Sequence, residues 1–73
     1  MSDALFLMAF SELLEIESGT IKGNEELIFI DNWDSLAVLG FIALADKKFG
    51  KILKPDDISR AKTVRDLINL IER

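Results

Sequence analysis

The chain has no histidine, no cysteine and no tyrosine among its 73 residues. Without cysteine it forms no disulfide and offers no thiolate to a metal ion. Without histidine it lacks the commonest metal ligand and the commonest general base near neutral pH. We therefore expect no metal site and no catalytic activity of its own. Without these cross-links stability has to come from apolar burial, and a hydrophobic content of 49% is enough for that. This favours one small helical domain over residues 1–73.

Long hydrophobic segments are also lacking. The longest apolar run, residues 36–45, has ten residues, well short of the ~20 that a membrane-spanning helix needs. No basic residue precedes the first apolar stretch, which argues against a signal peptide. We expect a cytoplasmic protein without a membrane segment.

Basic residues are scarce in the first half of the chain. Residues 1–35 carry eight acids and one base, net −7, and residues 36–73 carry five acids and eight bases, net +3, which sum to −4. The basic half is only modestly charged, so we expect no binding to nucleic acid. We interpret its lysines as a solvated rim in preference to a docking patch for an acidic partner. These are Lys47, Lys48, Lys51 and Lys54.

A first helix is predicted over residues 3–18, with Ser2 or Asp3 as N-cap and Gly19 supplying the left-handed residue that ends it. Its apolar residues gather on and beside one face: Leu5, Ala9, Leu13 and Ile16, flanked by Phe6, Phe10 and Leu14. The irregular segment 19–32 that follows holds one apolar patch, residues 27–30. A short strand is conceivable there, but a lone strand leaves its backbone groups unpaired. We favour a long loop whose apolar residues pack into the bundle, with Phe29 in the core.

A second helix is predicted from Asp34 or Ser35 to Phe49, with Gly50 as its stop. If Asp34 is the N-cap, Trp33 and Val38 occupy the two positions of a hydrophobic staple. The pattern places Leu36, Leu39, Ile42, Ala45 and Phe49 on the core face. It places Ala37, Val38, Gly40 and Phe41 partly or wholly off that face.

Two further helices complete the predicted fold. Pro55 and the acids after it indicate a short third helix over residues 55–60. Thr63 and Asp66 form a near capping box for a last helix. The core residues of that helix are Val64, Leu67, Ile68 and Ile71. The predicted fold is all-α: a small bundle of three main helices and one short helix, with a long loop between the first and the second.

The start of the second helix offers more capping residues than a helix uses. Asn32, Asp34 and Ser35 are all good N-caps, yet one side chain is enough. If Asp34 caps the helix, the hydroxyl of Ser35 remains at the first turn and can face solvent. A phosphodiester built on it would lie at the helix N-terminus, where the helix dipole and unpaired N–H groups favour an anion.

The ordered set "DNWDSLAVLGFIALADKKFG", "PDDI" and "TVRDLINLI" resembles the acyl carrier protein family of phosphopantetheine-dependent carriers. The resemblance covers about residues 5–72. It implies that Ser35 receives 4′-phosphopantetheine from coenzyme A through a magnesium-dependent phosphopantetheinyl transferase. It further implies that Asp34 helps present the serine and the metal to that transferase. By the same resemblance Leu36 is the apolar residue after the serine, and Phe49-Gly50 ends the recognition helix.

A carrier of this kind catalyses nothing itself. The thiol of the arm holds an acyl or aminoacyl group as a thioester, for fatty-acid, polyketide or secondary-metabolite synthesis. Expected partners are the transferase, an acyl- or aminoacyl-activating ligase and a downstream synthase or transferase, which act on a monomeric carrier. Because the acids along the second helix of housekeeping fatty-acid carriers are largely lost here, the chain looks more like a specialised stand-alone member.

The same loss of acids leads to a hypothesis about docking. We expect partners to dock on apolar residues of the second helix, Ala37, Val38 and Phe41, with little dependence on salt. The alternative is that Val38 and Phe41 belong to the core. Trp33 is interpreted as a packing anchor in preference to a wall for the arm.

Two other functions are weighed against the carrier. One is a helical interaction module with an apolar groove, in which Ser35 only caps a helix. The other is an enzyme with Asp31 and Asp34 as paired carboxylates, which is disfavoured because no base, nucleophile or set of metal ligands accompanies them.

Overall fold

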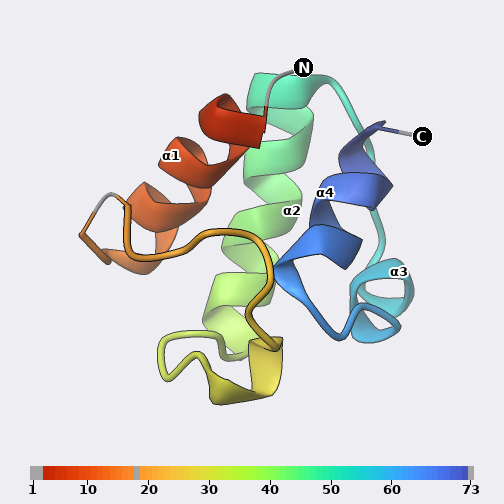
Figure 1. Cartoon of the computed structure of the whole chain (residues 1–73). Helices are drawn as coiled ribbons and strands as arrows, with labels where there is room; N and C mark the ends of the chain where they lie inside the picture. The colour runs from red at the N-terminus through yellow and green to blue at the C-terminus, as the bar shows by residue number, and fades with distance from the viewer. Residues whose placement is uncertain (1–2, 18, 73) are drawn as a thin grey trace.

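A computed structural model describes residues 3–17 and 19–72 of the chain. These residues form only helices and loops, as the all-α prediction expects (Figure 1). Ser2, a possible cap, and Ser18, the last residue of the predicted first helix, lie outside the described residues. The elements are α1 (Asp3–Leu14), the short 3-10 helix η1 (Leu27–Phe29), α2 (Ser35–Phe49), α3 (Pro55–Ser59) and α4 (Val64–Glu72).

Helix α1 is shorter than predicted, because it ends at Leu14 and not near residue 18. Glu15, not Gly19, takes the left-handed conformation after the last turn, with φ of 56°. The amide of Ile16 donates to the carbonyl of Ser11 at 2.9 Å, and that of Glu15 to the carbonyl of Glu12 at 3.1 Å. This pair of bonds is the Schellman arrangement, and its hydrogen bonds offset the strain of a non-glycine residue in that conformation.

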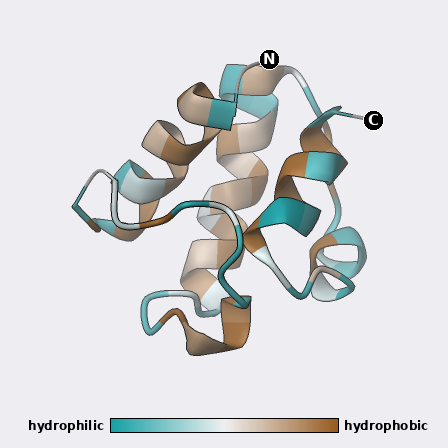
Figure 2. Ribbon diagram, in the orientation of Figure 1, coloured by the Kyte–Doolittle hydropathy of each residue, from teal (hydrophilic) through white to brown (hydrophobic). Residues whose placement is uncertain are grey.

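The core lies between α1, α2 and α4, and its centre is aromatic. Phe6, Phe10 and Phe41 are fully buried, and the Phe41 ring lies edge-on to the other two at centroid distances of 5.9 and 6.0 Å. Figure 2 shows hydrophobic residues along these helices and also on η1, at the end of the molecule. The predicted core positions of α4 are confirmed, since Val64, Leu67, Ile68 and Ile71 are all buried.

The face of α2 that enters the core differs from the predicted one. Ala37, Phe41 and Ala45 are buried, whereas Leu36 is 78% exposed and Leu39 is 60% exposed. Ala45 was placed correctly, and the predicted core residues Ile42 and Phe49 are half-buried. Residues 36–45 are apolar on every side, so the sequence offers no contrast between faces. Packing decides the face: at Gly40 the helices approach so closely that an added Cβ would lie 2.7 Å from Leu13 Cδ1.

The segment between α1 and α2 is a loop, and of its apolar patch only Leu27 is buried and Ile30 half-buried. Phe29, predicted to lie in the core, is 77% exposed, and Ile28 is 83% exposed. The reason is an isolated antiparallel bridge between Glu26 and Thr63, in which the Leu27 amide donates to the Lys62 carbonyl at 2.8 Å. This pairing fixes the loop beside the start of α4, with Leu27 turned inward.

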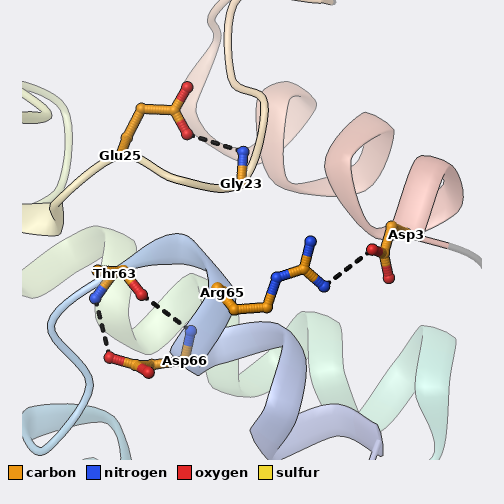
Figure 3. Close-up of polar contacts among 6 residues, drawn as sticks. All are labelled: Asp3, Gly23, Glu25, Thr63, Arg65 and Asp66. Atoms are coloured by element: carbon orange, nitrogen blue, oxygen red, sulfur yellow. Dashed lines mark hydrogen bonds and ion pairs between the residues drawn. The ribbon is translucent and has the colours of Figure 1, made fainter.

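Helix α4 starts with the predicted capping box, shown in Figure 3. The Asp66 amide donates to Thr63 Oγ1 at 3.2 Å, and the Thr63 amide donates to Asp66 Oδ2 at 3.1 Å. Hydrogen bonds from the Lys62 and Thr63 amides lower the pKa of Asp66. In the same view Arg65 forms an ion pair with Asp3 at 2.8 Å and so links α4 to α1.

Candidate functional site

Ser35 is the first residue of α2 and is exposed. The N-cap is Asp34, in extended conformation, and its Oδ1 accepts a hydrogen bond from the Ala37 amide at 2.9 Å. The Asp34 carbonyl accepts the Val38 amide at 2.9 Å, which starts the helical ladder. Of the three residues that the sequence offers as caps, Asp34 is the N-cap, so the Ser35 side chain is not needed for capping.

The end of α2 where Ser35 lies suits a negatively charged group. The first turn of this 15-residue helix contains no acidic residue, and its basic residues, Lys47 and Lys48, are in the last turn. The helix dipole therefore places partial positive charge next to the Ser35 hydroxyl. The Ala37 amide is already bonded to Asp34, so a phosphodiester on this oxygen would meet the amides of Ser35 and Leu36, which have no partner within the helix.

Trp33, which lies two residues before the serine, anchors the loop to the core. Its ring centroid lies 5.6 Å from that of Phe10 and 6.0 Å from that of Phe41. The side chain is half-buried, so one part packs inward and another stays accessible. The packing role predicted for Trp33 agrees with these contacts. Trp33 and Val38, the two predicted staple positions, both line the groove described in the next paragraph.

A groove of about 470 Å³ opens beside Ser35, between the N-terminal half of α2 and the region of α3. Its lining is apolar apart from two serines, and no charged side chain belongs to it. It is formed by Trp33, Ser35, Val38, Leu39, Pro55, Ile58, Ser59 and Ala61. The sequence pattern places Leu39 in the core and does not mark the last four residues as part of a site, because only the packing of α3 against α2 brings these four next to the serine.

The docking residues expected on α2 need correction. Ala37 is 8% exposed and Phe41 is fully buried, so neither can contact a partner in the folded protein. The alternative interpretation of Phe41 as a core residue is therefore correct. Val38 is half-buried and faces the groove. The exposed apolar residues next to the serine on α2 are Leu36, already expected at the site, and Leu39.

The two carboxylates considered above for an enzyme, Asp31 and Asp34, lie just before and at the start of α2. Asp34 is occupied as the helix cap, and Asp31 and Asp34 share a second hollow with Glu15, Asn32 and Leu36. Within residues 3–17 and 19–72, no group of three or more acidic residues is placed to hold a metal ion. In the same residues no helix is both long and apolar enough to cross a membrane.

The sequence model of a family described as "phosphopantetheine attachment site" matches residues 4–71, nearly the whole chain. Searches of curated proteins and of solved structures gave no match.

Proposed function

We propose that Ser35 is the residue that carries the cofactor, because the chain belongs to the phosphopantetheine attachment-site family. Domains of this family hold 4′-phosphopantetheine covalently and are carriers without catalytic activity, so this chain is a carrier and not an enzyme. The observation that supports Ser35 is its position: an exposed hydroxyl at the first turn of α2, next to an aspartate that already caps the helix.

The attachment is a transfer of a phosphoryl-linked group from coenzyme A. The Ser35 oxygen attacks the phosphorus that bears pantetheine, the bond to the adenosine bisphosphate breaks, and the serine proton leaves to the transferase. The base and the magnesium ion belong to a phosphopantetheinyl transferase, and the proposed role of Asp34 is to help present the serine and the metal to it. The reaction takes place in the cytoplasm, where coenzyme A is available.

The cargo in this proposal is an acyl or aminoacyl group, held as a thioester on the thiol of the arm. The groove beside Ser35 supports a neutral, apolar cargo, because its lining offers no charge to pair with an ammonium group. The partners are the transferase, an acyl- or aminoacyl-activating ligase and a downstream synthase or transferase. We assign the chain to a specialised pathway and not to housekeeping fatty-acid synthesis, because the first turn of α2 contains no acid.

Docking of these partners is proposed to use the exposed apolar residues Leu36 and Leu39, with Val38 at the groove. Contact between apolar surfaces is not screened by salt, so transfer should vary little with ionic strength. The Leu36→Ser variant should lower kcat/KM for the transferase. Ile52→Ser, which changes an 83% exposed residue near the other end of α2, is the matched control. A steep loss of transfer at high salt would contradict this docking mode.

The attachment itself is tested by intact mass. The apo protein is incubated with coenzyme A, magnesium and a promiscuous transferase, and should gain the mass of one phosphopantetheine. Ser35→Ala should gain nothing, whereas Ser59→Ala, which removes the other serine of the groove, should be modified like the wild type. A folded wild-type protein that stayed unmodified would instead favour an interaction module in which Ser35 is only part of the helix start.

A further inference from the structure

The C-terminus of α1 forms a hydrogen bond with a side chain that is distant in the sequence. The Schellman bonds satisfy the carbonyls of Ser11 and Glu12 but do not use the carbonyl of Leu14. That oxygen accepts a hydrogen bond from Asn32 Nδ2 at 2.8 Å, across 18 positions of the sequence. A side chain from the loop before α2 thus caps the end of α1.

Asn32 begins a run of three residues with three different anchors. Asn32 binds the end of α1, Trp33 packs against the aromatic core, and Asp34 caps α2. A further bond from the Trp33 amide to the Ile30 carbonyl, at 3.0 Å, closes a turn in the same segment. Ser35 is the next residue, so the place of its hydroxyl relative to the rest of the fold depends on this run.

The three anchors act on different parts of the molecule. The Asp34 bond is local to α2 and moves with that helix, so it does not hold the loop against α1. Trp33 is only half-buried, and ring packing tolerates sliding and tilting more than a directional hydrogen bond does. The Asn32 bond is directional and joins the segment to α1, the helix that also crosses α2 closely at Gly40.

We infer that Asn32 is a positioning residue for the modification of Ser35: by binding the Leu14 carbonyl it holds the segment 30–34, and with it the serine, in the orientation that the transferase accepts. The inference rests on the proposed role of Ser35. Without the bond the segment samples other arrangements, and the apparent efficiency of transfer falls with the fraction of molecules in the competent one. Asn32 does not itself take part in the chemistry.

The first test is transferase kinetics with coenzyme A as donor. Asn32→Ala should lower kcat/KM toward the carrier by about three- to tenfold, the effect of losing one hydrogen bond, while KM for coenzyme A stays unchanged. Asn32→Gln, which keeps an amide donor on a longer side chain, should restore part of the loss. Ile68→Val, a change in the buried face of α4, controls for lost stability and should be modified at the wild-type rate.

The second test needs no transferase. Trp33 is the only tryptophan, so quenching of its fluorescence by acrylamide reports on this segment alone. Quenching should increase in Asn32→Ala, return toward the wild type in Asn32→Gln, and stay unchanged in Ile68→Val. If Asn32→Ala matches the wild type in quenching and in kcat/KM, Asn32 has no positioning role, although Ser35 is still the attachment residue. If Ile68→Val slows modification as much as Asn32→Ala does, the effect is one of stability and the inference is wrong.

Discussion

The inward face of α2 is the feature of this fold that a stability measurement tests most directly. The sequence pattern places Leu39 in the core and Phe41 off it, whereas in the structure Leu39 is 60% exposed and Phe41 is fully buried. We expect Phe41→Leu to destabilise the protein clearly and Leu39→Ala to have little effect. Both variants introduce a residue with a higher helix propensity than the one it replaces, so propensity does not explain a loss of stability.

The size of the effect follows from the contacts of the Phe41 ring. It meets the rings of Phe6, Phe10 and Trp33 at centroid distances of 5.9, 6.0 and 6.0 Å, all near edge-on. Each such pair contributes about 0.5–1.5 kcal/mol beyond burial, and leucine fills the site imperfectly. The three pairs together give an expected loss of about 1.5–4.5 kcal/mol for Phe41→Leu. Leu39→Ala should stay within about 0.5 kcal/mol.

Leucine is a better replacement for Phe41 than alanine, because the domain has little total stability to lose. At about 0.05–0.15 kcal/mol per residue, a chain of this length has roughly 4–11 kcal/mol, and truncation to alanine, at about 3–5 kcal/mol, risks unfolding it. The assay is urea unfolding followed by far-UV circular dichroism, because Phe41→Leu also alters the surroundings of Trp33. In a thermal scan each kcal/mol lowers Tm by about 4–8 °C. A larger loss for Leu39→Ala than for Phe41→Leu would refute the assignment of the core face.

Three further changes test the local contacts. Asp34→Ala removes the cap of α2 and should cost about 1 kcal/mol in urea unfolding, whereas Asp34→Asn should retain most of it. The amides of Lys62 and Thr63 lower the pKa of Asp66, so its contribution to stability is present above the ordinary value of 3.8 and is lost as the pH falls through the lowered one. Asp66→Asn should therefore flatten the acid side of the stability–pH curve, and an unchanged curve would exclude this contribution. Arg65→Ala breaks an exposed ion pair with Asp3 and should cost under about 1 kcal/mol, less in high salt, as thermal scans at two salt concentrations would show.

Helix ends and caps were largely readable in the sequence, because they depend on residues three or four positions apart. Asp34, Gly50 and the pair Thr63 and Asp66 act as predicted. The end of α1 is the exception. Glu15 adopts the left-handed conformation that glycine normally takes. The carbonyl of the preceding residue, Leu14, accepts a hydrogen bond from Asn32, 18 residues further along the chain.

Which apolar residues are buried was readable only where polar residues separate the faces. In α4 the polar and apolar residues lie on different faces, and all four of its core residues were predicted. Helix α2 is apolar all round for ten residues, so several faces fit the pattern equally well. The exposure of Ile28 and Phe29 likewise follows from the pairing of Glu26 with Thr63. This contact joins segments far apart in the chain, so no local sequence pattern predicts it.

The sequence by itself determined the helices, most of their caps and a serine left over at the start of α2, because local hydrogen bonds and short-range periodicity encode them. Tertiary structure alone decided the surroundings of that serine: the groove that α3 completes, the exposed Leu36 and Leu39, and the bond from Asn32 to α1. These depend on how the helices pack, which is set by the sum of many contacts between residues far apart in the chain.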